Sequence, residues 1–297
     1  MKIDKVIIWG HKTNHTHSHI HSSYYRAFKH LGYETYWLDN PLEISSIDNC
    51  LFFTEGQVDF NIPLSKNSYY ILHHCNLEKY KNIGCKYIQL GNYLKFCTEG
   101  KNHYYPGASL EKLDSQVYYD SKNILLYQMW ATDLTPNEID ETLVIPFDNN
   151  LKEIYYVGSI WNENINQLKP FAESCIRDGR QFINRVNVSD EEHKQLIQKS
   201  LVCPDVRGEW HKECGYVPCR IFKNLSYGKF TATNSEHVAE VFEYKIPVSS
   251  ENNLYEVSKQ SYASVSKTHL QSLVKFIKEK HTYVNRISNL LKILETI

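Results

Sequence analysis

Short apolar runs alternate with amphipathic segments along the second half of this chain. The runs "IYYVG", "RQFINR", "LVCPDV" and "KFTATN" are each followed, directly or after a polar loop, by apolar residues at helical spacing. Short apolar runs bounded by turn residues indicate buried strands, and apolar residues at every third or fourth position indicate one-sided helices. Because a strand–helix alternation covers both faces of a parallel sheet, the pattern from 154 to 242 predicts an open α/β sheet. A Ser-x-x-Glu capping box at Ser189 and a cap at Ser235 predict the starts of helices over 189–200 and 235–242.

The first half of the chain begins in the same way. "KVIIW" (5–9) reads as a buried strand, "SSYYRAFKHLGY" (22–33) has helical spacing with Gly32 as a stop, and "YETYWLD" (33–39) reads as a second strand. This strand–helix–strand unit predicts the opening of a doubly wound parallel sheet. Five further strands are expected at 50–55, 68–74, 85–91, 115–120 and 123–130.

Two such sheets imply two domains. A chain of 297 residues is longer than one core usually supports. We expect the first domain over 1–150 and the second over 151–277. The final stretch "LQSLVKFIKEKHTYVNRISNLLKILETI" predicts one long amphipathic helix from 270 to the end. A helix of that length favours a return to the first domain from about 278, with packing on its own domain as the alternative.

Composition and charge narrow the class of protein. Hydrophobic residues at 42% and charged residues at 23% are ordinary for a globular protein, and a net charge of −1 argues against nucleic-acid binding. No apolar run is long enough to span a membrane and the start lacks a signal peptide, so we expect a cytoplasmic protein. The eight cysteines contain no Cys-x-x-Cys pair, which argues against a disulfide framework or a structural zinc site. The oligomeric state is not predicted.

Several segments resemble the glycosyltransferases of the GT-B fold. "YVPCRIFKNLSYGKFTATNSEHVAEVF" resembles their donor-side motif, and "IYYVGSIW" resembles the first strand and glycine loop of their donor domain. "HIHSSYYRAFKHLGYETYWLD" resembles the first β-α-β of the acceptor domain in bacterial and large-DNA-virus members, and "TYVNRISNLLKIL" resembles the closing helix. The resemblance implies two Rossmann-like domains with a cleft between them, acceptor-binding over 1–150 and donor-binding over 151–277, and a C-terminal helix crossing back.

The same resemblance implies an activity. It implies transfer of a hexose or pentose from a nucleoside diphosphate sugar, with UDP or GDP, to a glycan hydroxyl in glycan biosynthesis. Transfer without a metal cofactor is expected, since no Asp-x-Asp metal motif follows a strand, and inversion is expected only from the histidine-rich loop at 11–21. The Glu-x7-Glu donor signature is absent and Lys223 stands where many members have Glu, which leaves the sugar open. The alternative is a non-catalytic nucleotide- or sugar-binding protein of the same fold.

Arginines are the residues expected to hold the diphosphate. The departing nucleoside diphosphate gains negative charge, which a metal-free site compensates with guanidinium groups and helix N-termini. Arg220 lies in the first turn of the predicted helix 217–228, and Arg207 follows a predicted strand. A structural ion pair is the alternative for each. The other donor-binding candidates are strand ends, glycine-turn residues and helix starts: Gly158, Ser159, Arg185, Pro204, Asp205, Tyr216, Val217, Thr233, Asn234 and Ser235.

Five histidines crowd the loop "HKTNHTHSHIH" between the first strand and the first helix. In an open α/β sheet that loop borders the ligand crevice, and a neutral imidazole suits the base that an inverting transfer needs. We favour His21 or His19, then His17, as that base, with Asp39 and Asp133 as carboxylate alternatives. The alternating spacing leaves zinc binding open, but no Cys or carboxylate stands nearby in the sequence. A solvated or acceptor-binding loop is the third interpretation.

Overall fold

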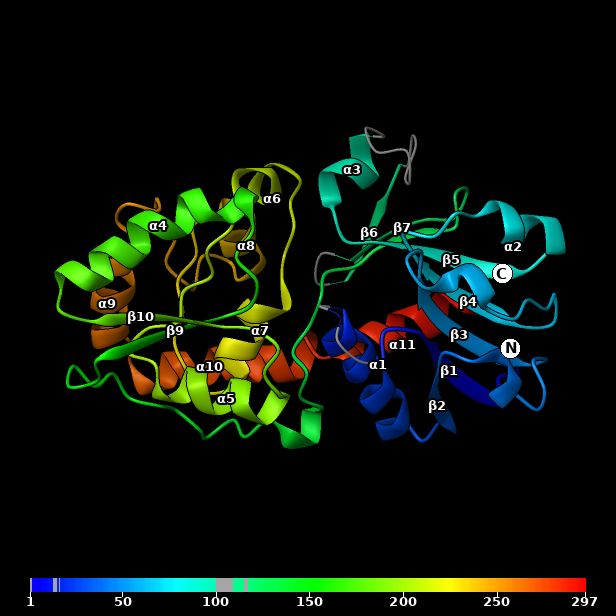
Figure 1. The fold of residues 1–297 in the computed structure, drawn as a ribbon, viewed down its shortest axis with the longest axis horizontal. Helices are drawn as coiled ribbons and strands as arrows, with labels where there is room; N and C mark the ends of the chain where they lie inside the picture. Colours follow the sequence, from blue (N-terminus) through cyan, green and yellow to red (C-terminus); the bar gives the residue numbers. More distant parts are fainter. Residues whose placement is uncertain (1, 13–14, 16, 100–108, 115–116) are drawn as a thin grey trace. The chain divides into compact units, whose positions relative to one another are not determined.

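The computed structural model describes residues 2–12, 15, 17–99, 109–114 and 117–297. The chain divides into two compact units: unit 1 comprises Met1–Thr135 and Tyr283–Ile297, and unit 2 comprises Pro136–Thr282 (Figure 1). The first boundary therefore lies earlier than the one near 150 expected from the sequence. The chain returns to unit 1 at Tyr283 rather than at 278.

Unit 1 is an α/β unit built on a mixed sheet. Among the described residues the sheet has eight strands in the order β2-β1-β3-β4-β5-β8-β7-β6. The first five strands and β8 run parallel, whereas β7 and β6 add an antiparallel edge. The α/β class predicted from the sequence is confirmed. The bounds are β1 Lys5–Trp9, β2 Thr35–Leu38, β3 Cys50–Glu55, β4 Tyr69–His73, β5 Lys86–Gly91, β6 Glu111–Asp114, β7 Val117–Asp120 and β8 Leu125–Tyr127.

The helices of unit 1 pack on this sheet through aromatic contacts. Tyr24 on α1 stacks on Phe53 of β3 with ring centroids 4.1 Å apart, and it also meets Tyr283 of α11 at 4.6 Å. All three side chains are buried. Helix α1 begins earlier than predicted, so His19 and His21 lie in its first turn. The helices are α1 Ser18–His30, α2 Glu78–Ile83, α3 Leu94–Glu99 and α11 Tyr283–Leu294, with 3-10 turns η1 Pro41–Glu43 and η2 Asp59–Asn61.

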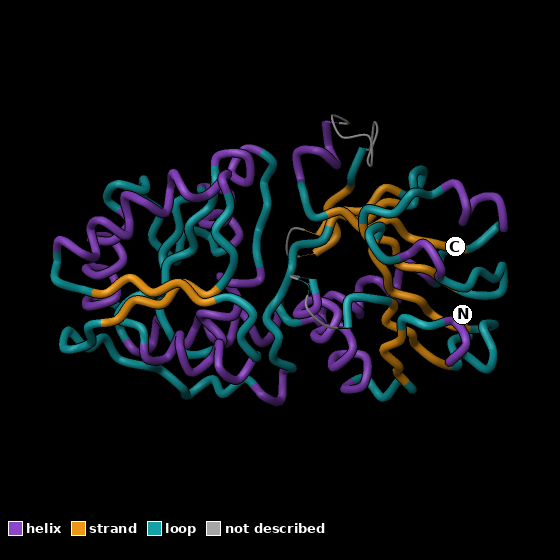
Figure 2. Tube along the Cα trace, viewed as in Figure 1, coloured by secondary structure: helices purple, strands orange, loops and turns teal. Residues whose placement is uncertain are grey.

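Unit 2 has a smaller regular sheet than the sequence predicts. Only β9 (Glu153–Val157) and β10 (Gln181–Arg185) are strands in 136–282, and they pair in parallel (Figure 2). The strands expected at 201–206 and 229–234 are reduced to isolated parallel bridges, Asp205 to Thr233 and Thr233 to Val248. Proline 204 has no N–H for a ladder. The carbonyl of Cys203 instead accepts side-chain hydrogen bonds from Asn224 at 2.7 Å and Thr231 at 2.8 Å.

The helices of unit 2 show two of the predicted caps. The Ser189 side chain accepts from the Glu192 N–H at 3.1 Å, and Ser235 caps the next helix through the Val238 N–H at 3.4 Å. Both predicted helix starts are therefore confirmed. The helices are α4 Asn162–Arg177, α5 Asp190–Lys199, α6 Glu209–Glu213, α7 Cys219–Ser226, α8 Glu236–Val241, α9 Leu254–Ser264 and α10 Lys267–Lys280, with η3 Pro136–Glu138 near the start.

The prediction of a single long C-terminal helix from 270 to the end is wrong. Helix α10 ends at Lys280 and α11 begins at Tyr283. Between them His281 leaves helical geometry, with φ −131° and ψ 40°. Its ring is buried and stacks on Phe222 with centroids 4.8 Å apart. Side-chain packing inside unit 2 thus outweighs the continuous helical periodicity of the sequence.

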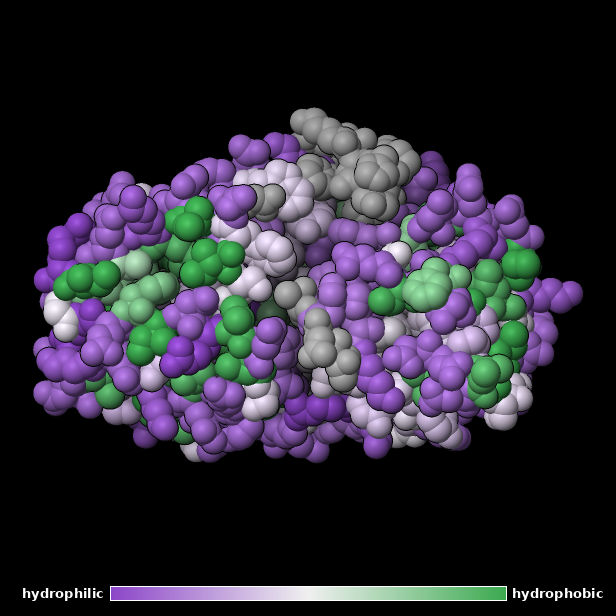
Figure 3. All heavy atoms as spheres, in the orientation of Figure 1, coloured by the Kyte–Doolittle hydropathy of each residue, from purple (hydrophilic) through white to green (hydrophobic). Residues whose placement is uncertain are grey.

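The surface is mainly hydrophilic on the face drawn in Figure 3, where apolar side chains form scattered groups on both units. The most exposed large apolar side chains are Leu42 and Phe60. Of the helices in the described ranges, none has both the length and the apolar composition required to cross a membrane. This agrees with the lack of a long apolar run in the sequence.

Candidate functional site

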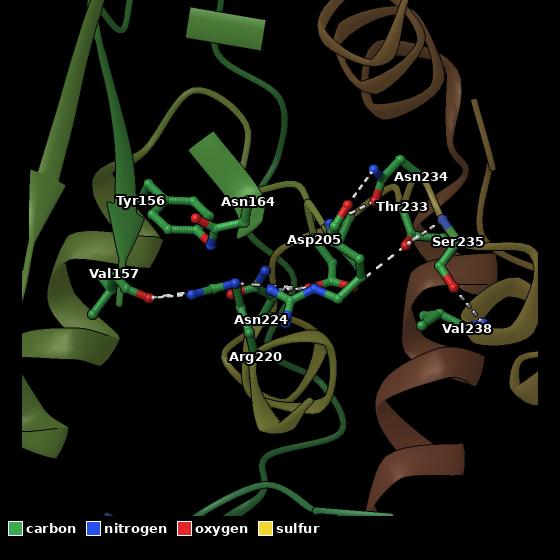
Figure 4. A network of polar contacts seen from close by, with 12 residues as sticks. Tyr156, Val157, Asn164, Asp205, Arg220, Asn224, Thr233, Asn234, Ser235 and Val238 are labelled. Carbon is green, nitrogen blue, oxygen red and sulfur yellow. Dashed lines mark hydrogen bonds and ion pairs between the residues drawn. The ribbon is translucent and has the colours of Figure 1, made fainter. Parts of the chain in front are cut away.

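In unit 2, an arginine closes over the carboxyl end of β9. Arg220, in the first turn of α7, donates from Nε at 3.2 Å and from Nη2 at 2.9 Å to the carbonyl of Val157 (Figure 4). Its guanidinium carbon lies 4.1 Å from the centroid of the Tyr156 ring. Gly158 makes this approach feasible: it has φ +138°, and a Cβ there would lie 2.2 Å from Arg220 Nη2.

A second arginine and an aspartate complete a buried charge cluster. Arg207 Nη2 lies 2.9 Å from Asp205 Oδ1, and Arg220 Nη1 lies 3.8 Å from the same oxygen. Asp205 is fully buried. Arg207 Nε and Arg220 Nη1 have no hydrogen-bond partner among the residues that the structure describes. Two guanidinium groups thus share one carboxylate and retain unused N–H donors at a sheet edge, which suits an anion.

Three predicted residues hold this cluster in place. Asn234 accepts from the Arg207 N–H at 2.6 Å and donates to the Arg207 carbonyl at 2.8 Å. Thr233 donates its hydroxyl to Asp205 Oδ2 at 3.3 Å and accepts from the Ser235 N–H at 3.2 Å (Figure 4). Ser235 also caps α8 through its side chain. The structure therefore brings these residues beside Asp205 and Arg207, where their polar atoms bond to protein groups.

His211 belongs to this site, and the sequence analysis missed it. Burial, followed by the positive charges of Arg207 and Arg220, lowers the pKa of His211 to about 4. Its ring stacks on the predicted Tyr216 with centroids 4.7 Å apart, and the Trp210 ring lies 5.3 Å away and is 39% exposed. The segment "RGEWHKECGY" reads as a polar loop, in which the adjacent rings of Trp210 and His211 were the available signal.

The other predicted donor residues lie around the same strands. Pro204 and Val217 are buried. The Ser159 carbonyl accepts from Asn164 at 3.4 Å. The Arg185 carbonyl accepts from the Gly158 N–H at 2.8 Å, but the Arg185 side chain is exposed. Of this group, only Arg185 presents a charged side chain, and it points to solvent rather than into the cluster of buried arginines.

In unit 1, the histidine loop meets a buried carboxylate that the sequence analysis also missed. His11 follows β1, Glu55 is the last residue of β3 and His73 is the last residue of β4. These strands are neighbours in the sheet. The chain builds the sheet outward from β1 to β2 on one side and from β3 to β4 on the other, so the strand order changes direction between β1 and β3. Carboxyl strand ends at such a reversal form the usual ligand position of an open α/β sheet. Glu55 could have been recognised as a candidate site residue from the sequence, because it ends the predicted strand 50–55.

Four side chains converge at this edge. His11 Nε2 lies 2.7 Å from Glu55 Oε2, and His17 Nδ1 contacts the same oxygen. The His15 ring stacks on His11 with centroids 3.8 Å apart. One ligand atom from each of these residues lies within 4.8 Å of the others. Burial alone would raise the pKa of Glu55, but the hydrogen bonds from His11 and His17 outweigh it and hold the pKa well below its ordinary value.

The remaining base candidates lie in different surroundings. His21 is 2% exposed, its Nδ1 contacts the Gly10 carbonyl at 3.1 Å, and burial lowers its pKa to about 3. His19 is partly buried in the first turn of α1, Asp39 is exposed after β2, and Asp133 is buried. His17 belongs to the four-residue cluster, with its side chain 29% exposed.

No protein-family model matches this chain, and a search of the curated proteins finds no relative. The two sites described above are therefore the basis for assigning a function.

Proposed function

We propose that this protein is a glycosyltransferase that moves a sugar from a nucleoside diphosphate sugar, with UDP or GDP, to a glycan hydroxyl. One observation carries the proposal: the buried Arg207 and the partly buried Arg220 have N–H donors without a partner among the described residues, beside the glycine turn that ends β9. The resemblance of 217–242 to the donor motif of GT-B enzymes includes Arg220. On that basis we propose the GT-B arrangement, with unit 2 as the donor domain and unit 1 as the acceptor domain.

Charge explains why a diphosphate suits this site. The cluster contains two guanidinium groups and one carboxylate, so one largely buried positive charge is left over. Burying an unbalanced charge is costly, and a bound anion reduces that cost. The charge that develops on the departing diphosphate is then stabilised by donors already in place, without a metal at the donor site. The exposed Trp210 and the His211–Tyr216 stack offer aromatic faces for the nucleoside base.

The acceptor hydroxyl needs a base, and we assign it to His19. His21 is too buried and too weak a base, because its pKa is about 3. His17 already contacts Glu55. His19 is more accessible than His21 and lies on the same helical turn; Asp39 is the alternative. Deprotonation by either residue corresponds to inversion at the anomeric carbon.

Nucleotide binding tests the donor half of the proposal. A panel of nucleotides and nucleotide sugars, measured with chelator present, is expected to raise the thermal midpoint with UDP or GDP. Arg220→Lys keeps the charge but loses the planar two-donor group, so we expect roughly 10- to 100-fold weaker binding. Arg177→Lys, an exposed arginine on α4, serves as the matched control and should bind normally. The absence of a shift with every nucleotide would reject the proposal.

Catalysis separates the transferase from a non-catalytic binding protein of the same fold. We expect donor-sugar hydrolysis or transfer in the native chain and its loss in His19→Ala, with nucleotide affinity retained. NMR of the product reads the anomeric configuration. Unchanged turnover in both His19→Ala and Asp39→Asn would remove the proposed base, and nucleotide binding without any turnover would favour the binding protein.

A further inference from the structure

We propose that His11, His15, His17 and Glu55 of unit 1 bind one divalent transition-metal ion, with Zn²⁺ as the best match. Three imidazoles and one carboxylate form a common ligand set for zinc, and imidazole also suits Co²⁺, Ni²⁺ and Cu²⁺. This proposal does not rest on the sugar-nucleotide proposal, because the residues that carry the latter argument lie in unit 2.

The distances fit a tetrahedral site after small side-chain rotations. Metal–ligand bonds of about 2.0–2.2 Å place the ligand atoms of a tetrahedral zinc site roughly 3.3 Å apart. In the structure, His11 Nε2 and Glu55 Oε2 are 2.7 Å apart, and the widest separation in the set is within 4.8 Å. The observed separations therefore bracket the required one. The Nδ1 of His15 accepts from the His17 N–H at 3.1 Å.

The backbone before the cluster is shaped to aim His11 at Glu55. Gly10 and His11 both have left-handed backbone geometry, with φ +79° and +51°. A Cβ at Gly10 would lie 2.4 Å from a methyl carbon of Val58, so only glycine fits there. A non-glycine residue such as His11 adopts this conformation at a cost, and such strain concentrates at functional sites. The turn directs the ring back over the end of β3.

Burial also favours a cation at this site. Glu55 is 3% exposed, and its Oε2 contacts imidazole nitrogens of His11 and His17. A buried carboxylate is costly to leave without a counter-charge, which a divalent ion supplies. His73 adds a nearby polar atom: its ring lies 5.8 Å from that of His17, and its buried Nε2 has no hydrogen-bond partner within the described part of the chain.

Zinc titration of the chelator-treated full chain tests the proposal. Isothermal calorimetry with Zn²⁺ is expected to show one ion per chain, and X-ray absorption of the loaded protein should show about three imidazole nitrogens and one oxygen ligand. Glu55→Gln and His15→Ala are expected to weaken Zn²⁺ binding by at least roughly tenfold. His15 is only partly buried and Glu55→Gln preserves shape, so both variants should fold, which circular dichroism checks.

His30→Ala is the matched control, because His30 is exposed at the far end of α1. It should bind Zn²⁺ like the native chain, and His19→Ala should do so as well. Equal losses in His30→Ala and His15→Ala, or several weak ions per chain that His15→Ala does not reduce, would overturn the site in favour of surface binding. Nucleotide affinity measured in Glu55→Gln keeps the two proposals apart: we expect it unchanged, whichever way the zinc experiment turns out.

Discussion

At the scale of single residues, the candidate donor site depends on Gly158, which has no side chain, as well as on the charged side chains. Arg220 reaches the Val157 carbonyl only because Gly158 has no Cβ. Asp205 lies within ion-pair distance of both arginines. The Asn234 side chain bonds to both the N–H and the carbonyl of Arg207. A strand end, a glycine turn and a helix start are thus tied to one buried charge cluster.

Gly158→Ala is expected to disrupt this cluster. The new methyl would meet Arg220 Nη2, and the φ of +138° strains any residue with a side chain. We expect a loss of about 1–3 kcal/mol in the free energy of unfolding and weaker nucleotide binding. Chemical denaturation and nucleotide titration measure both. Gly179→Ala is the control, because Gly179 has φ +69° but nothing within 4 Å of a Cβ; it should lose stability without losing affinity.

His211 predicts a pH dependence of stability. Its pKa is about 4 in the folded protein and near 6.5 when unfolded, so below pH 6.5 the unfolded state binds more protons. Stability is therefore full above pH 6.5 and falls as the pH drops toward 4. When the pH falls from about 7.5 to 5, we expect the free energy of unfolding to decrease by roughly 1 kcal/mol less in His211→Gln than in the native chain, after allowing for partial exposure. Urea denaturation at both pH values measures this. An equal decrease in the unfolding free energy of the variant and of the native chain would contradict this prediction.

At the scale of elements, tertiary contacts decide where helices begin and end. Local signals placed α5 and α8 correctly because Ser189 and Ser235 cap them within the chain. The break between α10 and α11 depends instead on His281 packing against Phe222, a residue far away in sequence. Helix α11 is then held to unit 1 by Arg286, which donates to the carbonyls of Met129 and Trp130, both at 3.0 Å.

Arg286→Met is expected to loosen α11. The substitution keeps much of the buried volume but leaves the carbonyls of Met129 and Trp130 without these donors. We expect a loss of about 3 kcal/mol or more, because Arg286 is nearly fully buried and both acceptors lie in the interior. Limited proteolysis of the C-terminus and thermal unfolding measure the effect. Lys292→Met, an exposed position on the same helix, should change neither.

At the scale of the whole molecule, unit 1 is assembled from both ends of the chain. Its sheet comes from the first 135 residues, but α11 returns from beyond unit 2. The buried face of α11 is mainly apolar, with Ile287, Leu290, Ile293 and Leu294. Folding of unit 1 therefore depends on residues that follow unit 2 in the sequence.

Deletion of 283–297 is expected to unfold unit 1 and spare unit 2. Four buried aliphatic side chains at roughly 1.5–3 kcal/mol each contribute about 6–12 kcal/mol, which is comparable with the whole stability of a domain. Scanning calorimetry should show that the truncated chain retains one unfolding transition, and that transition should still respond to UDP or GDP. Two intact transitions would show that α11 is dispensable.

The sequence by itself determined the order of most strands and helices, two of the helix caps and the arginines that the structure brings together. Those features are local: alternation, capping side chains and strand ends can be read within a few residues. Only the tertiary structure decided the reduced sheet of unit 2, the break after α10, and the approach of Glu55 to His11 and of His211 to the arginines. Each of these depends on residues distant in the chain, whose proximity is set by strand order and core packing rather than by spacing.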